Sequence, residues 1–230
     1  MTGQTKSAAA PSLAVIWDID GTLIDSAELH FRAWHKIGEE LGFKISREQF
    51  ASTFGLRNPD VIIRLFGTGC DVARGQQIAH KKEAYYRGMA ASELRFLAGA
   101  EDRLNEFKRL NVPQALATSA PRGNVDLFLE VTRSQHFFVA VVTMEEVTRG
   151  KPDPEVFLTA AQRAGIEPQH CVVFEDAPAG VVGAKRAGMK CIGTTACGYH
   201  SDAQLKEAGA DLVIDSLRAV DIARVRSLFL

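Results

Sequence analysis

Two carboxylates, Asp18 and Asp20, stand one residue apart where an apolar run ends, in the segment LAVIWDIDGTLID at residues 13–25. Carboxylates this close repel each other, so a fold that keeps them there needs a cation or a shared proton. A divalent metal ion with oxygen ligands is the simplest answer. The pair also suits a reaction in which one carboxylate attacks as nucleophile while the other moves protons. The alternative is a plain turn, which Asp and Gly both favour.

Two later segments carry groups that suit a phosphate. Thr118 and Ser119 follow the apolar run QALA, and their hydroxyls and the following amides could hold a phosphate oxygen where a helix begins. A helix cap at Ser119 is the alternative. Lys151 lies between Gly150 and Pro152, where the backbone is restricted, so a fixed cation there could neutralise phosphate and Asp18. An exposed loop lysine is the alternative.

A third segment, CVVFED, ends in Glu175 and Asp176 before a helix. Asp176 could complete a magnesium site with Asp18 and a backbone carbonyl, since Mg²⁺ is usually held by one or two carboxylates, water and substrate phosphate. Asp176 could also cap the helix that follows, and the two roles are compatible.

Short apolar runs and helices alternate along the chain, and they decide where these groups lie. The run at residues 13–19 is typical of a strand that is covered on both faces of a parallel sheet. Further runs at 113–117, 138–142, 171–176, 190–195 and 211–215 alternate with helical patterns. We therefore predict an α/β fold with a doubly wound parallel sheet, Rossmann-like in its core. Ligands bind outside the carboxyl ends of such strands, so the polar groups should meet there.

Residues 29–94 read as a block of helices without a strand. Apolar residues recur every fourth position from Leu29 to Leu41, Ser46 and Gln49 form a capping box, and Asn58 with Pro59 marks another helix start. A further helix is expected from about residue 71 to 91. We predict a helical cap at 29–94, a core formed by 12–28 and 95–230, and a disordered arm at 1–11. An inserted cap can close over the strand ends as a lid.

Composition excludes several classes of protein. The chain of 230 residues is 46% hydrophobic and 24% charged with a net charge of −1, so nothing indicates binding to nucleic acid or to an anionic membrane. No apolar run reaches the length of a membrane span or a signal peptide. The four cysteines lack metal-site or redox spacing and are expected to be reduced thiols, at positions Cys70, Cys171, Cys191 and Cys197. We expect a cytoplasmic monomer.

The order DIDGT, TS, GKPDP, FED resembles the haloacid dehalogenase (HAD) superfamily of aspartate-nucleophile phosphotransferases over residues 13–214. The helical block is similar to the small cap that one subfamily inserts between its first and second motifs. The resemblance implies that Asp18 is the nucleophile, Asp20 the general acid and base, Thr118 a phosphoryl ligand and Lys151 the balancing charge. Asp at position 20 favours phosphate esters over carbon–halogen bonds, because a leaving alkoxide needs a proton.

The resemblance also implies a Mg²⁺ site. One ligand is expected to be a backbone carbonyl and Glu175 to be a neighbour or indirect ligand. The candidate metal residues are Asp18, Asp20, Glu175 and Asp176.

The first helix, DSAELHFRAWHKIGEELGF, resembles that of the β-phosphoglucomutase type, which implies that His30 lies beside the acid/base Asp20. The cap stretch TFGLRNPD departs from that type. Phe54 stands where the mutase has a lysine, Arg57 falls one position early, and Asn58 takes the place of the arginine. The loop TSAPRGN is also longer. These departures weaken the mutase interpretation and favour small-molecule phosphatases of the family.

We therefore predict a Mg²⁺-dependent phosphomonoester hydrolase that acts on a small phosphorylated metabolite, of the sugar phosphate or phosphoglycolate type. A hexose-phosphate mutase is the first alternative, and a non-catalytic binding domain on the same scaffold is the second. Candidate substrate contacts are His30, Arg57, Asn58, Ser119 and Arg122. His30 could instead be a half-buried helical residue, and Arg57, Asn58 and Arg122 could be solvated surface residues.

Overall fold

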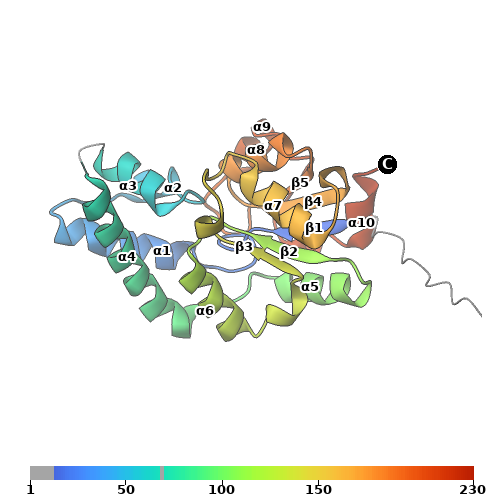
Figure 1. Ribbon diagram of the computed structural model, residues 1–230, viewed down its shortest axis with the longest axis horizontal. Helices are drawn as coiled ribbons and strands as arrows, with labels where there is room; N and C mark the ends of the chain where they lie inside the picture. Colours follow the sequence, from blue (N-terminus) through green and yellow to red (C-terminus); the bar gives the residue numbers. More distant parts are fainter. Residues whose placement is uncertain (1–12, 68–69) are drawn as a thin grey trace, which may run out of the picture.

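A six-stranded parallel sheet forms the centre of the computed structural model, which describes residues 13–67 and 70–230 (Figure 1). The strands lie in the order β3-β2-β1-β4-β5-β6, and every pair is parallel. Their bounds are β1 (Ala14–Trp17), β2 (Gln114–Ala117), β3 (Ala140–Val142), β4 (Cys171–Glu175), β5 (Lys190–Thr194) and β6 (Leu212–Ile214). This order is that of a doubly wound sheet, which confirms the predicted fold class.

Helices cover both faces of the sheet, and alternate residues of β1 face the two layers. Val15 and Trp17 pack with α5 (Ala100–Arg109), α6 (Arg122–Thr132) and α10 (Ile222–Ser227). Ala14 and Ile16 pack with α7 (Glu155–Ala164), α8 (Pro178–Arg186) and α9 (Asp202–Glu207) on the other face (Figure 1). All four strand residues are buried, as expected for a continuous apolar run in a parallel sheet.

Four helices between β1 and α5 form a separate layer at the left of Figure 1, which we call the cap. They are α1 (Ala27–Glu40), α2 (Arg47–Ala51), α3 (Asn58–Phe66) and α4 (Val72–Glu93). Their shared apolar cluster includes Trp34, Phe50, Phe54 and Val61. Within the described part of residues 27–93 there are helices and no strand, as predicted. The capping box from Ser46 to Gln49 is present.

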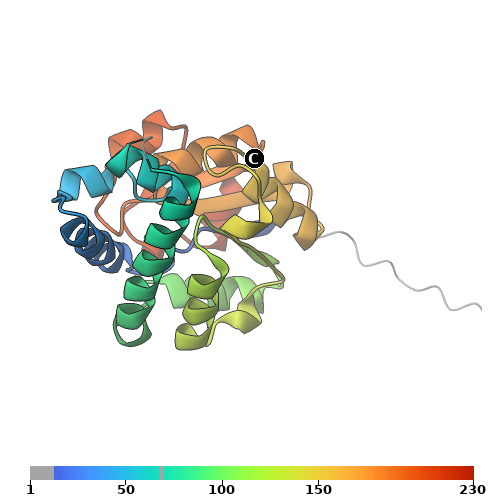
Figure 2. The same ribbon diagram turned by 60° about the vertical axis from the view of Figure 1, so that its left-hand side comes forward.

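The cap contacts the core along α4, which lies beside α6 in both views (Figures 1 and 2). The cap bounds at residues 29 and 94 stay predictions, and the predicted arm at 1–11 lies outside the described residues. No helix in the described ranges is both long enough and apolar enough to cross a membrane.

Candidate active site

The predicted polar segments meet at the carboxyl edge of the sheet. Asp18 follows β1, Thr118 follows β2, and Glu175 and Asp176 end or follow β4. Because β1 pairs with β2 on one side and with β4 on the other, these ends are neighbours. Lys151 reaches the same place from the loop between β3 and α7. Residues far apart in sequence are therefore brought together by the strand order.

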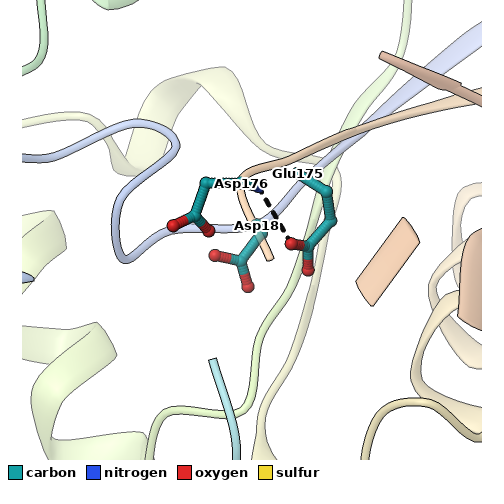
Figure 3. A group of neighbouring side chains, drawn as sticks. All are labelled: Asp18, Glu175 and Asp176. Carbon is teal, nitrogen blue, oxygen red and sulfur yellow. Dashed lines mark hydrogen bonds between the residues drawn. The ribbon is translucent and has the colours of Figure 1, made fainter. Parts of the chain in front are cut away.

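Three buried carboxylates converge at this edge, as Figure 3 shows for Asp18, Glu175 and Asp176. One oxygen from each lies within 4.8 Å of the others. Burial, opposed by Lys151 and reinforced by Glu175, raises the pKa of Asp18 to about 8. Burial and the neighbouring charges of Glu175 and Asp18 raise the pKa of Asp176 well above its usual value. Such a group of hard oxygen atoms fits a divalent cation, which would relieve the repulsion.

Lys151 is the cation of this group. Its Nζ lies 2.5 Å from Asp18 Oδ1 and 2.5 Å from Glu175 Oε1, and the residue is only 4% exposed. Burial alone would lower the pKa of Lys151, but the charges of Asp18 and Glu175 hold it above its usual value. The alternative of an exposed loop lysine is therefore wrong. One lysine still leaves three carboxylates with excess negative charge.

The two oxygens of Glu175 are already engaged. Oε1 accepts from Lys151, and Oε2 accepts from the backbone N–H groups of Asp176 and Ala177, at 3.0 Å each. This arrangement favours a supporting position for Glu175 beside the metal site. The Asp20 carboxylate is also directed elsewhere, toward Ser26 and His30, and its role as a metal ligand stays a prediction.

Asp176 faces the carboxylate group instead of capping the helix after it. The N-cap residue of α8 is Ala177, and no side chain caps this helix, so the capping alternative is wrong. Its Oδ1 lies 3.5 Å from Thr22 Oγ1 and its Oδ2 3.1 Å from Cys197 Sγ. Gly21, with φ +82°, passes so close that an added Cβ would collide with the Asp176 carboxylate. The turn after β1 therefore requires glycine on both conformational and steric grounds.

The hydroxyls after β2 differ in their partners. Thr118 Oγ1 accepts from the backbone N–H of Ala120 at 3.0 Å. Ser119 Oγ is buried and has no hydrogen-bond partner among the described residues. Ser119 also lines a cavity between the cap and the strand ends, which is described below. Helix α6 begins after Pro121 without a side-chain cap, so the capping alternative for Ser119 is wrong. A buried hydroxyl without a partner is the kind of group that a bound ligand satisfies.

Asp20 lies at the end of a hydrogen-bonded chain that enters the cap. Its Oδ1 accepts from Ser26 Oγ at 2.6 Å and lies 3.0 Å from His30 Nε2. Lys82 Nζ lies 2.7 Å from His30 Nδ1, and an ammonium can only donate, so Nε2 carries the proton that faces Asp20. Burial alone would raise the pKa of Asp20, but His30, Ser26 and Lys82 together hold it below its usual value.

The chain continues from Lys82 to Glu83, two buried charges of α4. Glu83 Oε1 accepts from Lys82 Nζ and from Asn58 Nδ2, at 2.8 Å each, and Oε2 accepts from Asn124 Nδ2 at 2.6 Å. Burial would raise the pKa of Glu83, but Lys82, His30 and Asn124 lower it to about 2. Glu83 thus joins the cap helix α3 to the core helix α6.

Three residues of this chain of hydrogen bonds were not predicted from the sequence: Lys82, Glu83 and Asn124. A signal for Lys82 was present, because Ile78, Lys82, Tyr86 and Ala90 recur at intervals of four and form the buried face of α4. A lysine in the apolar stripe of a helix needs a buried partner.

Two predicted substrate contacts, Arg57 and Arg122, do not line the cavity. Arg57 Nε lies 3.3 Å from Asp60 Oδ2, and its Nη1 donates to the Thr148 carbonyl at 3.2 Å. The Arg122 side chain is 59% exposed and its Nε lies 2.8 Å from Asp126 Oδ1. Both remain predictions as substrate contacts.

A cavity between cap and strand ends brings the remaining candidates together. It holds about 480 Å³ of empty space when its open mouth is included. The predicted residues among its walls are Asp18, Asp20, His30, Asn58, Thr118 and Ser119. Most other cap residues there are apolar or aromatic: Trp34, Phe50, Phe54, Leu56 and Val61.

Comparison with known proteins agrees with this geometry. Residues 15–194 match the family described as haloacid dehalogenase-like hydrolase. The chain is 31% identical over 209 residues to validoxylamine A 7'-phosphate phosphatase of Streptomyces hygroscopicus subsp. limoneus, covering 89% of this chain and 94% of that protein. It is 34% identical over 188 residues to β-phosphoglucomutase of Bacillus subtilis, covering 78% and 82%. A HAD hydrolase of family IA, variant 3, from Entamoeba histolytica superposes with a TM-score of 0.85 at 28% identity, covering 94% and 99%.

Proposed function

Because this chain belongs to the haloacid dehalogenase-like hydrolases, in the subfamily whose helical cap lies between β1 and β2, we propose that it is a Mg²⁺-dependent phosphatase of small phosphorylated metabolites. Its substrate is a phosphomonoester of the sugar phosphate or phosphoglycolate type, and an aspartyl-phosphate forms on Asp18. The convergence of Asp18, Glu175, Asp176 and Lys151 beside a small cavity carries this proposal. The phosphatase of Streptomyces among the relatives supports it.

The residues for the metal are Asp18, Asp176 and the backbone carbonyl of Asp20, with Glu175 holding Lys151 next to them. When bound, Mg²⁺ would offset negative charge on Asp18 and on the phosphoryl oxygens.

In the first step Asp18 attacks phosphorus in line with the leaving oxygen. A bond forms between a carboxylate oxygen and phosphorus while the ester P–O bond breaks. Lys151, fixed against Asp18, balances charge as the phosphoryl group arrives. Thr118 and Ser119 bind phosphoryl oxygens, which gives the buried Ser119 hydroxyl a partner.

Asp20 moves the protons of both steps. His30 and Lys82 favour its ionised form, and an anionic phosphoryl group nearby raises its affinity for a proton. Asp20 gives that proton to the leaving oxygen as the ester bond breaks. It then takes a proton from water, whose oxygen attacks phosphorus, so the bond to Asp18 breaks and inorganic phosphate leaves.

Release of inorganic phosphate from a panel of esters tests this proposal. The panel contains hexose and hexitol phosphates, phosphoglycolate and nucleotides, each with Mg²⁺ and with chelator. We expect Mg²⁺-dependent turnover of at least one small ester and its loss in Asp18→Asn, whose fold is checked by circular dichroism. Turnover that survives in Asp18→Asn would exclude Asp18 as nucleophile. A wild-type protein that binds these esters but turns none over would support the non-catalytic alternative.

A mutase is the second candidate, favoured by the 34% identity to β-phosphoglucomutase of Bacillus subtilis. The test supplies β-glucose 1-phosphate with β-glucose 1,6-bisphosphate as primer and follows both products. Glucose 6-phosphate in excess of released phosphate would overturn the phosphatase proposal. The cytoplasmic location and monomeric state remain predictions.

A further inference from the structure

We propose that the cap end of the cavity selects a leaving group with a free hydroxyl and rejects a second phosphate. Asn58 is the residue that hydrogen-bonds to the hydroxyl. Glu83 is the positioning residue, because it fixes the orientation of the Asn58 amide. The substrate class is thus a polyol or sugar monophosphate rather than a bisphosphate. This inference rests on the proposed phosphatase activity.

The orientation of the Asn58 amide follows from its partner. A carboxylate only accepts hydrogen bonds, so the Asn58 atom 2.8 Å from Glu83 Oε1 is the donor Nδ2. The other amide atom, Oδ1, accepts no hydrogen bond among the described residues, although Asn58 is only 8% exposed and lines the cavity. The amide is left with Oδ1 as an acceptor and with the second hydrogen of Nδ2 as a donor. A hydroxyl can satisfy both, because it donates to Oδ1 and accepts from Nδ2, whereas an ionised phosphate oxygen only accepts and leaves Oδ1 without a partner.

The charges at this end also disfavour a second phosphate. Among the described residues that line the cavity, Lys82 and His30 are the cap groups able to carry positive charge. The two side chains are hydrogen-bonded to each other, and the positive charge of Lys82 is balanced by the Glu83 carboxylate at 2.8 Å. Arg57, the N-cap residue of α3, is held outside by Asp60 and the Thr148 carbonyl. A second phosphate would approach a buried carboxylate without a spare cation.

The apolar walls complete the description of the ligand. Phe54, Leu56 and Val61 line the cap side of the cavity, where they can cover a carbon skeleton but offer no donor to an anion. A site that pairs one buried polar group with a hydroxyl rejects analogues that lack it more strongly than a purely apolar site does. Asn58 therefore supplies specificity that Phe54 and its neighbours cannot.

Two pairs of probes test the inference on the wild-type protein. Fructose 1-phosphate and fructose 1,6-bisphosphate differ by the second phosphate, and sorbitol 6-phosphate and n-hexyl phosphate differ by their hydroxyls. We expect kcat/KM to favour fructose 1-phosphate and sorbitol 6-phosphate, each by roughly tenfold or more. Equal or faster turnover of the bisphosphate would overturn the inference.

Variants separate positioning from a general structural role. In Glu83→Gln the amide side chain both donates and accepts, so Asn58 can turn, and the kcat/KM ratio of bisphosphate to monophosphate should rise by roughly tenfold. In Asn58→Leu the preference for sorbitol 6-phosphate over n-hexyl phosphate should fall toward one. Glu93→Gln is the matched control, because Glu93 is also on α4 but pairs with Arg32 at the surface. A merely structural role would slow all esters alike and leave both ratios unchanged, which would contradict the inference.

Calorimetric binding to Asp18→Asn with Mg²⁺ gives a readout that does not depend on turnover. Tighter binding of fructose 1-phosphate than of the bisphosphate supports the inference, and the reverse order overturns it. Absence of phosphate release from every ester by the wild type would instead contradict the proposed function, while this binding comparison still decides the inference.

Discussion

At the sheet end of the cavity, Asp18, Glu175 and Asp176 converge with Lys151 as their cation, whereas at the cap end Lys82 and Glu83 form a pair of equal and opposite charge. With all three carboxylates ionised the sheet end carries excess negative charge, and burial, reinforced by Glu175, raises the pKa of Asp18 to about 8. The cap end is balanced, and the pKa of Glu83 is lowered to about 2. One end of the cavity therefore suits a cation and a phosphate, and the other end suits a neutral group. This difference distinguishes the phosphoryl group of an ester from its leaving group.

Removal of the metal should have the largest effect, because only the sheet end needs a cation. With chelator, we expect turnover to fall by roughly 10³-fold or more, and Mg²⁺ should raise the unfolding temperature of the wild type. Asp176→Asn should lose both responses. Phosphate-release assays and calorimetry measure them, and Asp102→Asn, an exposed aspartate of α5, is the control. If Mg²⁺ still stabilised Asp176→Asn fully, Asp176 would not be a ligand.

Acid should weaken the cap end through Glu83. Its pKa is about 2 in the folded protein against an ordinary 4.5, so its contribution to stability is complete above pH 4.5 and is lost as the pH falls through 2. At about 1.4 kcal/mol per pH unit this contribution is about 3 kcal/mol. Glu83→Gln should therefore lower the free energy of unfolding by about this amount at pH 7 and by less at pH 3.

Urea unfolding at the two pH values measures this difference. Glu93→Gln, with its carboxylate at the surface, should show little change. A Glu83→Gln deficit that is the same at both pH values would mean that the charge of Glu83 is not what stabilises the cap.

His30→Gln tests the connection between the two ends. Loss of the imidazole removes the hydrogen bond to Asp20 and the link to Lys82, so kcat should fall by roughly 100-fold. The pKa of Asp20 should rise without this partner, and the limb of the pH–rate profile that follows Asp20 should move to higher pH. His35→Gln, on the same helix but 40% exposed, should leave the profile in place. An unmoved profile in His30→Gln would rule out control of Asp20 by His30.

Arg122→Ala should have the smallest effect. The guanidinium pairs with Asp126 one helical turn away at the surface, an interaction typically worth about 0.5 kcal/mol or less. We expect kcat/KM to change by less than about twofold and the unfolding temperature to stay close to that of the wild type. A loss of tenfold or more would restore Arg122 as a substrate contact and place the rim of the core within reach of the ligand.

Sequence could predict the sheet end because strand ends are visible in the chain. Asp18, Thr118 and Asp176 each follow an apolar run, and parallel pairing brings such ends together without further information. Lys151 lies four positions before the start of α7, in a loop that the same topology places beside the strand ends. The doubly wound fold class and most helix positions follow from the same alternation of patterns. The six-residue α10 was not predicted, because so short a helix shows little periodicity.

The cap end depends on packing that the sequence pattern does not specify. Lys82 and Glu83 read as solvent-facing charges of a long helix until α4 is laid against α1 and α6. Arg57 illustrates the converse, because its type suits a phosphate but the contacts with Asp60 and Thr148 turn it away from the cavity. The direction of a long side chain is set by tertiary neighbours, so its residue type alone was not sufficient.

The insertion of the cap after β1 has a consequence for how the molecule folds. Trp17 of β1 donates to Gln114 of β2 across 97 positions, whereas His30 and Lys82 of the cap are 52 apart. Closing the longer loop costs more chain entropy and slows pairing, so we expect amides of α1 and α4 to gain hydrogen-exchange protection before those of β1. Pulse labelling during refolding measures the order, and earlier protection of β1 would contradict it. The return of enzymatic activity during refolding would then follow the rate at which the sheet forms, and not the rate at which the cap helices form.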